Sequence, residues 1–209
     1  MAVSKFMAQQ YSKPSGWIGQ VLMGPLLNRS NAKSNAVVYD ALAPRSNARV
    51  LEIGFGGGEL LFRIAKNLTS GSIHGVEISK PMMERANATI HRRGLCDKVH
   101  LHKGTIEDLP FSNEHFDFVC SVNTIYFWPN LSRGINELAR VTRKNGVVVL
   151  GFGSDTALRQ SGYEDKGFNL YSPDHIVEAL SDSGFYLDKL EKMNRKSRGP
   201  FFVSRSTKL

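Results

Sequence analysis

The chain has 209 residues, of which 41% are hydrophobic and 22% charged, and its formal net charge is +8. These proportions are those of a soluble globular protein, and the length suits one domain with a full-sized core. No run of about 18 apolar residues is present, so we expect no membrane span. Two cysteines do not make a disulfide framework. Because no secretory signal is present either, we expect reduced thiols and a cytoplasmic protein.

Residues 1–34 form a lead segment that contains no acidic residue and is repeatedly broken by glycine and proline. These breaks count against the long amphipathic helix of a transit peptide. The segment is nevertheless too apolar for a free tail. Its apolar residues include Phe6, Met7, Tyr11, Trp17, Ile18, Leu22, Met23, Leu26 and Leu27. We therefore expect residues 1–34 to close as a lid over a functional site in the main domain, residues 35–209.

From residue 35 onward, strand-like apolar runs alternate with amphipathic stretches. The pattern predicts strands at 49–53, 72–76, 98–102, 116–121, 146–152, 185–191 and 201–205. It predicts helices at 35–43, 58–68, 80–93, 131–142 and 173–183. This alternation is typical of a parallel sheet with helices on both faces. The last two strands follow each other without a helix, so we expect an antiparallel pair at one edge. The predicted fold is an α/β three-layer sandwich with a seven-stranded, mostly parallel, Rossmann-like sheet.

The strongest local signal is the glycine cluster that follows the first predicted strand. Gly54, Gly56 and Gly58 occupy alternate positions, and glycine permits both a positive φ and a close approach of a ligand to the backbone. Glu77 stands nineteen residues after Gly58, at the end of the second predicted strand. An acid at that place can accept hydrogen bonds from a ribose diol. The pattern predicts a nucleoside-containing cofactor at the open end of the sheet.

The residues around the glycines indicate which cofactor this is. A dinucleotide fingerprint needs a third glycine where this chain has Glu59, and a carboxylate there opposes a pyrophosphate. No Gly-Lys-Ser/Thr follows, so a P-loop is excluded as well. Glu52 precedes the first glycine by two residues, and an acid in a buried strand needs a partner. A cationic ligand would be such a partner for Glu52. S-adenosylmethionine carries an ammonium and a sulfonium group and no phosphate.

Several blocks, in order, resemble the class I S-adenosylmethionine-dependent methyltransferases, particularly those that act on small molecules. The resemblance runs from about Ala48 to Phe152. It covers Val50–Gly58, Gly75–Ser79, the loop Gly104–Phe111, the strand Phe116–Asn123, and Glu137–Val141 with Lys144-Asn145-Gly146. One departure concerns the loop that binds adenine in this family, which often has Asp where this chain has Thr105. The usual carboxylate contact to the adenine amino group is therefore not expected from this position.

The candidate cofactor-binding residues are Glu52, Gly54, Gly56, Gly58, Glu77, Ile78, Thr105, Ile106 and Asn123. The resemblance implies that Ile78 lies against the adenine face and that Thr105 and Ile106 frame its edge. Asn123 is expected to contact the methionine portion or to line the path of methyl transfer. For Ile78 a plain core role is the alternative, and for Asn123 it is a strand-end cap.

The catalytic group is less well defined. Tyr126-Phe127-Trp128 follows Asn123 and either walls an apolar substrate, faces the sulfonium by cation–π attraction, or packs in the core. A base is needed only if the acceptor must lose a proton, and Tyr126 and Tyr11 are the candidates. The stretch from Asn123 to Tyr126 lacks both prolines of the motif used in nucleic-acid amino methylation. The histidines have no metal-ligand spacing, so we expect no metal.

The sequence therefore predicts an S-adenosylmethionine-dependent methyltransferase that acts on a small-molecule acceptor by in-line transfer. We expect neither nucleic acid nor a membrane as a partner. Two alternatives stay open: a methyltransferase acting on nucleic acid or protein, which the basic charge favours, and a non-catalytic module that binds the cofactor. The acceptor atom, the use of a base, the oligomeric state and the pathway are also open at this stage.

Overall fold

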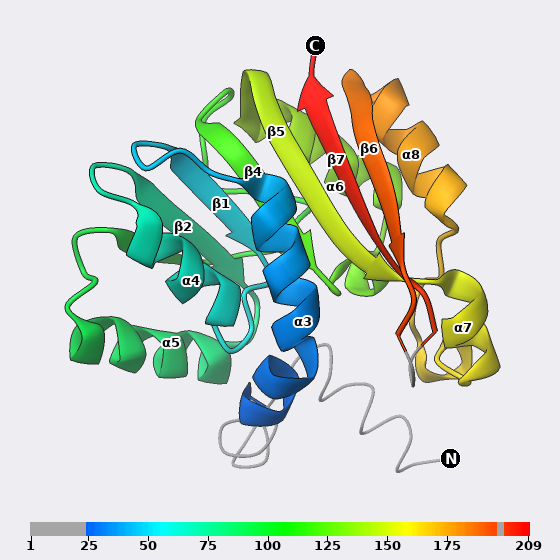
Figure 1. Ribbon diagram of the computed structural model, residues 1–209, viewed down its shortest axis with the longest axis horizontal. Coiled ribbons are helices and arrows are strands. Elements are labelled where there is room, and N and C mark those ends of the chain that lie inside the picture. Colours follow the sequence, from blue (N-terminus) through cyan, green and yellow to red (C-terminus); the bar gives the residue numbers. More distant parts are fainter. Residues whose placement is uncertain (1–23, 196–198) are drawn as a thin grey trace.

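The computed structural model of the protein describes residues 24–195 and 199–209. Residues 1–23, and with them most of the expected lid and Tyr11, lie outside the described part. The described chain folds into one seven-stranded sheet with helices on both faces (Figure 1). Helices α3, α4 and α5 contribute to the core on one face, and α6 and α8 to the core on the other. This arrangement confirms the predicted three-layer α/β fold.

The strands are β1 (Arg49–Ile53), β2 (Ser72–Glu77), β3 (Val99–Lys103), β4 (Phe116–Val122), β5 (Thr142–Gly153), β6 (Phe185–Met193) and β7 (Phe201–Lys208). Their order across the sheet is β3-β2-β1-β4-β5-β7-β6. The first five strands in the chain are parallel to one another. Strand β7 is antiparallel to both β5 and β6. Every predicted strand is present, and the antiparallel pair lies at the edge as expected.

The helices are α3 (Gly24–Leu42), α4 (Glu59–Asn67), α5 (Lys80–Arg93), α6 (Leu131–Val141), α7 (Asp155–Gln160) and α8 (Pro173–Asp182). Two short 3₁₀ helices, η2 (Ile125–Phe127) and η3 (Glu164–Lys166), precede α6 and α8. The predicted start of the first of these helices was wrong, because α3 begins at Gly24 and passes residue 35 without a break. A proline in the first helical turn, here Pro25, removes an N–H that has no partner in the helix anyway. Helix α7 is too short for its periodicity to be recognised in the sequence.

Apolar side chains on one face of each helix attach the helix layers to the sheet. On α4, Leu60, Leu61 and Ile64 are fully buried against the sheet. On α6, Ile135 and Leu138 are fully buried on the opposite face. Burying a side chain of this size contributes about 1.5–3 kcal/mol. These two helices follow β1 and β4 at short range, so their packing fixes the loops that leave the two strands.

Those loops emerge at the same edge of the sheet, because parallel strands end together. The end of β1 at Ile53 pairs with Val76 of β2 on one side and Ser121 of β4 on the other. In Figure 1 this carboxyl edge is the lower one, toward which β1 and β5 point. The glycine loop after β1 therefore lies between Glu77 and the turn that begins at Asn123.

Candidate functional site

The three glycines of the loop after β1 all have a positive φ, at 69° for Gly54, 50° for Gly56 and 79° for Gly58. Their surroundings differ. A Cβ on Gly54 would lie 2.5 Å from the Thr124 side chain, and one on Gly58 would lie 2.8 Å from Phe62. A Cβ on Gly56 would meet nothing within 4 Å. The first and last glycines thus serve local packing as well as the turn. Gly56 alone leaves the open space that a close-approaching ligand requires.

Glu77 ends β2 and turns its buried carboxylate toward the glycine loop. One oxygen accepts a hydrogen bond from the Gly56 amide at 3.0 Å, and the other accepts one from the Ser79 amide at 2.9 Å. Burial raises the pKa of Glu77, and these backbone amides act against that rise. The side chain therefore joins the glycine loop to the start of α5. Each carboxylate oxygen has a second lone pair, so both remain able to accept from a diol.

Glu52 lies within β1 and is buried, with 4% of its surface exposed. Its Oε2 atom has no hydrogen-bond partner in the described part of the chain. Burial raises the pKa of Glu52 to about 8, and the nearby carboxylates of Glu77 and then Glu59 add to the rise. A buried carboxylate with an unsatisfied oxygen strongly favours a positive ligand group beside it. This orphaned atom fits the cationic cofactor that the sequence predicts.

Glu59 occupies the position at which a dinucleotide-binding chain has its third glycine. It is the first residue of α4, and its Oε2 accepts a hydrogen bond from Asn35 of α3 at 3.3 Å. The carboxylate thus takes the place beside the helix N-terminus where a pyrophosphate would bind. The geometry agrees with the exclusion of a dinucleotide.

Asn123 begins the turn after β4 with an unusual positive φ of 56°. Its amide nitrogen donates to Asn31 of α3 at 3.2 Å, and its amide oxygen accepts from the Tyr126 hydroxyl at 3.4 Å. The Tyr126 hydroxyl in turn accepts a hydrogen bond from the Gly153 amide at the end of β5. Burial raises the pKa of Tyr126 to about 12. At neutral pH the phenol is therefore protonated and acts as a hydrogen-bond donor.

Thr124 is a residue of this site that the sequence did not single out. Its hydroxyl contacts the hydroxyl of Ser121 and accepts a hydrogen bond from Trp128 Nε1 at 3.2 Å. Ser121 also donates to the carbonyl of Ile53 at 2.9 Å, which ties β4 to the start of the glycine loop. Tyr126 and Trp128 are both buried in the core and Phe127 packs against it, so all three aromatics have a packing role. No sequence motif marked Thr124, because its role depends on the contact with Gly54.

The expected adenine-side residues follow the ends of β2 and β3. Ile78 is 39% exposed directly after Glu77, so its side chain is accessible to a ligand. Thr105 is exposed, whereas Ile106 is buried in the core beside Gly134 of α6. The Gly104 amide donates to the Glu77 carbonyl at 3.3 Å, which places the loop next to the end of β2.

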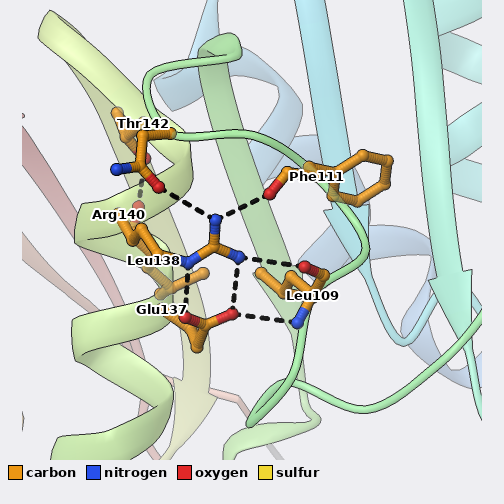
Figure 2. Close-up of polar contacts among 7 residues, drawn as sticks. Leu109, Phe111, Glu137, Leu138, Arg140 and Thr142 are labelled. Atoms are coloured by element: carbon orange, nitrogen blue, oxygen red, sulfur yellow. Dashed lines mark hydrogen bonds and ion pairs between the residues drawn. The ribbon is translucent and has the colours of Figure 1, made fainter.

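An ion pair on α6 holds this loop in place (Figure 2). Glu137 accepts a hydrogen bond from the Leu109 amide at 2.9 Å, and it pairs with Arg140 at 2.6 Å. Arg140 donates to the carbonyls of Leu109 and Phe111 at 2.9 and 2.6 Å. The pairing with Arg140 lowers the pKa of Glu137. The sequence assigned these two residues to a family block, but their action as a clamp on the loop required the structure.

Four histidines gather on β2, β3 and the start of β4. The Nδ1 atom of His74 lies 3.1 Å from Nε2 of His102, and the His74 ring also contacts the rings of His100 and His115. Burial, followed by the charges of these neighbours, lowers the pKa of His74 to about 3.

Over residues 24–195 and 199–209 no group of three or more His, Cys, Asp or Glu side chains is arranged to hold a metal ion. No described helix is long and apolar enough to cross a bilayer.

The site thus combines an open glycine turn, a carboxylate at the end of β2 and a buried carboxylate beside them. Residues 51–150 match the sequence family described as a methyltransferase domain. Together with the fold, this match confirms the resemblance of the chain to the class I S-adenosylmethionine-dependent methyltransferases. S-adenosylmethionine is the cofactor that these methyltransferases use, and Glu52 and Gly56 fit that group by charge and by space.

Curated relatives of the chain are distant and generally longer. The 2-methyl-6-phytyl-1,4-hydroquinone methyltransferase 2 of Oryza sativa subsp. japonica is 28% identical over 75% of the chain, which spans 45% of that protein. The uncharacterized protein MJ1123 of Methanocaldococcus jannaschii is 34% identical over 66% of the chain and 64% of its own length. Similarity at this level supports the family and leaves the acceptor to be inferred.

Solved structures share the fold. The geranyl diphosphate C-methyltransferase of Streptomyces coelicolor A3(2), solved with Mg²⁺, geranyl diphosphate and S-adenosyl-L-homocysteine, superposes with a TM-score of 0.76. The superposition covers 94% of this chain and 86% of the other at 12% identity. A common fold at this identity hosts many activities, so the acceptor must be argued from the site.

Proposed function

We propose that this protein transfers a methyl group from S-adenosylmethionine to a small-molecule acceptor. The observation that carries the proposal is the pair of buried carboxylates, Glu52 and Glu77, beside the open turn at Gly56. Named relatives such as the hydroquinone methyltransferase of rice act on small molecules, which supports the same class of acceptor here. Free thiols at Cys96 and Cys120 support a cytoplasmic location.

The proposed roles follow from charge and position. Glu77 accepts hydrogen bonds from the ribose diol, and Glu52 attracts the ammonium group. Ile78 lies against the adenine ring, whose edge is framed by Thr105 and Ile106. Gly54 and Gly58 set the turn that lets Gly56 approach the ligand closely. These assignments place the cofactor over β1 and β2.

The methyl-transfer step is proposed to occur near Asn123 and Tyr126, at the ends of β4 and β5. When bound, S-adenosylmethionine supplies an activated methyl group on its sulfonium, so the protein mainly aligns the acceptor with that bond. Such positioning can lower a barrier by about 7–11 kcal/mol. Because burial raises the pKa of Tyr126 to about 12, its phenol stays protonated and orients Asn123 by donating a hydrogen bond.

We also propose that residues 1–34 form a lid on the acceptor side. The described end of that segment supports this proposal. Asn31 accepts a hydrogen bond from Asn123 at 3.2 Å, and Ser34 accepts one from Arg195 at 3.4 Å. A lid over these groups would exclude water from the reacting centre.

The test uses methyl-labelled S-adenosylmethionine with the full-length protein and a cell extract. The extract is divided into a small-molecule fraction, a nucleic-acid fraction with a nuclease-treated control, and a protein fraction. We expect label in the small-molecule fraction alone. Label in nucleic acid or protein would replace the proposed acceptor class. Measured cofactor binding without transfer to any fraction would support a non-catalytic module.

A further inference from the structure

Arg195 lies just beyond β6 at the carboxyl edge, on the side away from the cofactor-binding strands. Its Nε donates to the Gly199 carbonyl at 3.3 Å, and its Nη1 donates to the Ser34 hydroxyl at 3.4 Å. The guanidinium carbon stands over the Phe201 ring at 4.7 Å from the centroid. The aromatic face and the two oxygens hold the planar guanidinium in one orientation.

This guanidinium converges with the Tyr126 phenol on one point at the end of β5. A Cβ on Gly153 would lie 3.1 Å from the Tyr126 hydroxyl and 3.3 Å from Nη2 of Arg195. Asn123 belongs to the same polar cluster, because its amide oxygen accepts a hydrogen bond from Tyr126. The order β2-β1-β4-β5-β7 separates this cluster from Glu77 by two strands. The cluster therefore borders the end of the site where an acceptor would meet the methyl group.

The positive charge of the chain is concentrated in two segments of its sequence. Residues 1–39 and 192–209 hold ten of the 27 Lys and Arg residues and none of the 19 Asp and Glu residues. Apart from these two segments, the chain is slightly acidic. The Ser34–Arg195 contact joins the two basic segments at the carboxyl edge. An excess of positive charge raises the local concentration of a ligand of opposite charge.

We propose that the methyl acceptor carries an oxyanion, either a carboxylate or a phosphate ester, that binds Arg195 beside the hydrogen-bonded pair of Tyr126 and Asn123. This inference rests on the proposed function and specifies its substrate class. A guanidinium matches the spacing of two oxygens on one anionic group, which a lysine ammonium does not. An anchored anion would fix the acceptor at one end and leave its nucleophile facing the sulfonium.

The direct test is calorimetry on the full-length protein saturated with S-adenosylhomocysteine. Inorganic diphosphate and benzoate serve as the phosphate and carboxylate probes. We expect one of them to bind, and we expect Arg195→Gln to weaken that binding about tenfold to a hundredfold, the range for hydrogen bonds to a charged group. The matched control is Lys192→Gln, which removes an exposed cation of β6 three residues before Arg195 and should bind like the wild type. Equal binding by Arg195→Gln, or binding of neither probe, overturns the proposal.

A second measurement separates anion recognition from a structural role. Arg195→Gln should have the same affinity for S-adenosylhomocysteine and the same melting temperature as the control variant Lys192→Gln. If both fall, Arg195 only anchors the chain at Gly199 and the proposal is wrong.

The third measurement addresses the acceptor itself. A small-molecule extract is separated on an anion exchanger, and each fraction is tested for methylation. We expect the acceptor in the retained fraction and a rise in KM, with a smaller change in kcat, for Arg195→Gln. An acceptor in the unretained fraction overturns the inference but leaves the methyltransferase assignment intact. Transfer in no fraction counts against the proposed function, and the calorimetry with diphosphate and benzoate then decides the oxyanion site by itself.

Discussion

The Gly56 amide donates a 3.0 Å hydrogen bond to the carboxylate of Glu77, 21 residues further along the chain. The same carboxylate accepts from the Ser79 amide. One side chain thus connects the turn after β1 with the helix start after β2. The residue proposed to bind the ribose also shapes the loop over which the cofactor lies.

We predict that Glu77→Ala weakens S-adenosylmethionine binding and also lowers the stability of the unliganded protein. Each effect should be about 1–3 kcal/mol, because two backbone amides and a ligand diol lose a charged acceptor. Calorimetry gives the first effect and urea unfolding the second. Glu84→Ala, on the exposed side of α5, is the control. Loss of stability with unaltered cofactor affinity would make Glu77 purely structural.

The glycines of the turn should respond differently to alanine. Gly56→Ala is expected to cost about 1–2 kcal/mol of stability, because a side chain at positive φ is strained, while the added methyl enters open space. Its larger effect should be a loss of cofactor affinity. Gly54→Ala should mainly destabilise the fold, because its methyl meets Thr124, and shortening Thr124 to serine should recover part of that loss. Full cofactor affinity in Gly56→Ala would show that no ligand approaches this position.

The raised pKa of Glu52 makes stability depend on pH. The folded state keeps this proton up to about pH 8, whereas the unfolded chain loses it near 4.5. The stabilising effect of the proton is thus complete below pH 4.5 and is lost as pH rises toward 8. The loss should be at most about 1.4 kcal/mol per pH unit. Glu52→Gln should remove this slope between pH 5 and 8 in thermal unfolding, and an equal slope in both proteins would contradict the assignment.

The same group should couple cofactor binding to proton release. An ammonium beside Glu52 favours the carboxylate, so binding between pH 5.5 and 7.5 should release a proton and strengthen as pH rises. For one proton the limit is about tenfold per pH unit. Over this range the α-amino group of the ligand stays mostly protonated. Calorimetry in buffers of different ionisation enthalpy measures the release, which should be absent in Glu52→Gln.

The histidine cluster predicts sensitivity to acid. The pKa of His74 is lowered from 6.5 to about 3 by burial, by the other three histidines and by Arg49. The stability that this group contributes is present above pH 6.5 and is lost as pH falls toward 3. His74→Phe should reduce the fall in melting temperature between pH 7 and pH 4. His91→Gln, on the exposed face of α5, should leave it unchanged. A steeper fall in His74→Phe would contradict this explanation.

The lid proposal predicts the effect of deleting residues 1–23. The shortened chain keeps α3, whose Val38 and Leu42 are fully buried in the core, so it should remain folded. Cofactor binding should weaken and methyl transfer should cease, because the acceptor side loses its cover. Far-ultraviolet circular dichroism checks the fold, and calorimetry and turnover check the function. A truncated protein that binds and turns over like the full chain would assign the segment to targeting or docking.

The sequence by itself determined the fold and the class of protein. Local patterns sufficed, because the alternation of strands and helices and the spacing from Gly54 to Glu77 are written in short stretches of chain. The charge of Glu52 and the replacement of a glycine by Glu59 were also enough to choose a cationic cofactor over a dinucleotide. These are properties of residue type and order.

Only the tertiary structure decided which of these residues act together. The contact of Gly54 with Thr124, the clamp of Glu137 and Arg140 on the loop, and the convergence of Arg195 with Tyr126 join positions that are distant in the chain. Such pairs leave no periodic signal, because they depend on strand order and on the packing of helices over the sheet. The shifted pKa values of Glu52 and His74 also depend on the tertiary structure, because it creates the burial and the neighbouring charges that shift them.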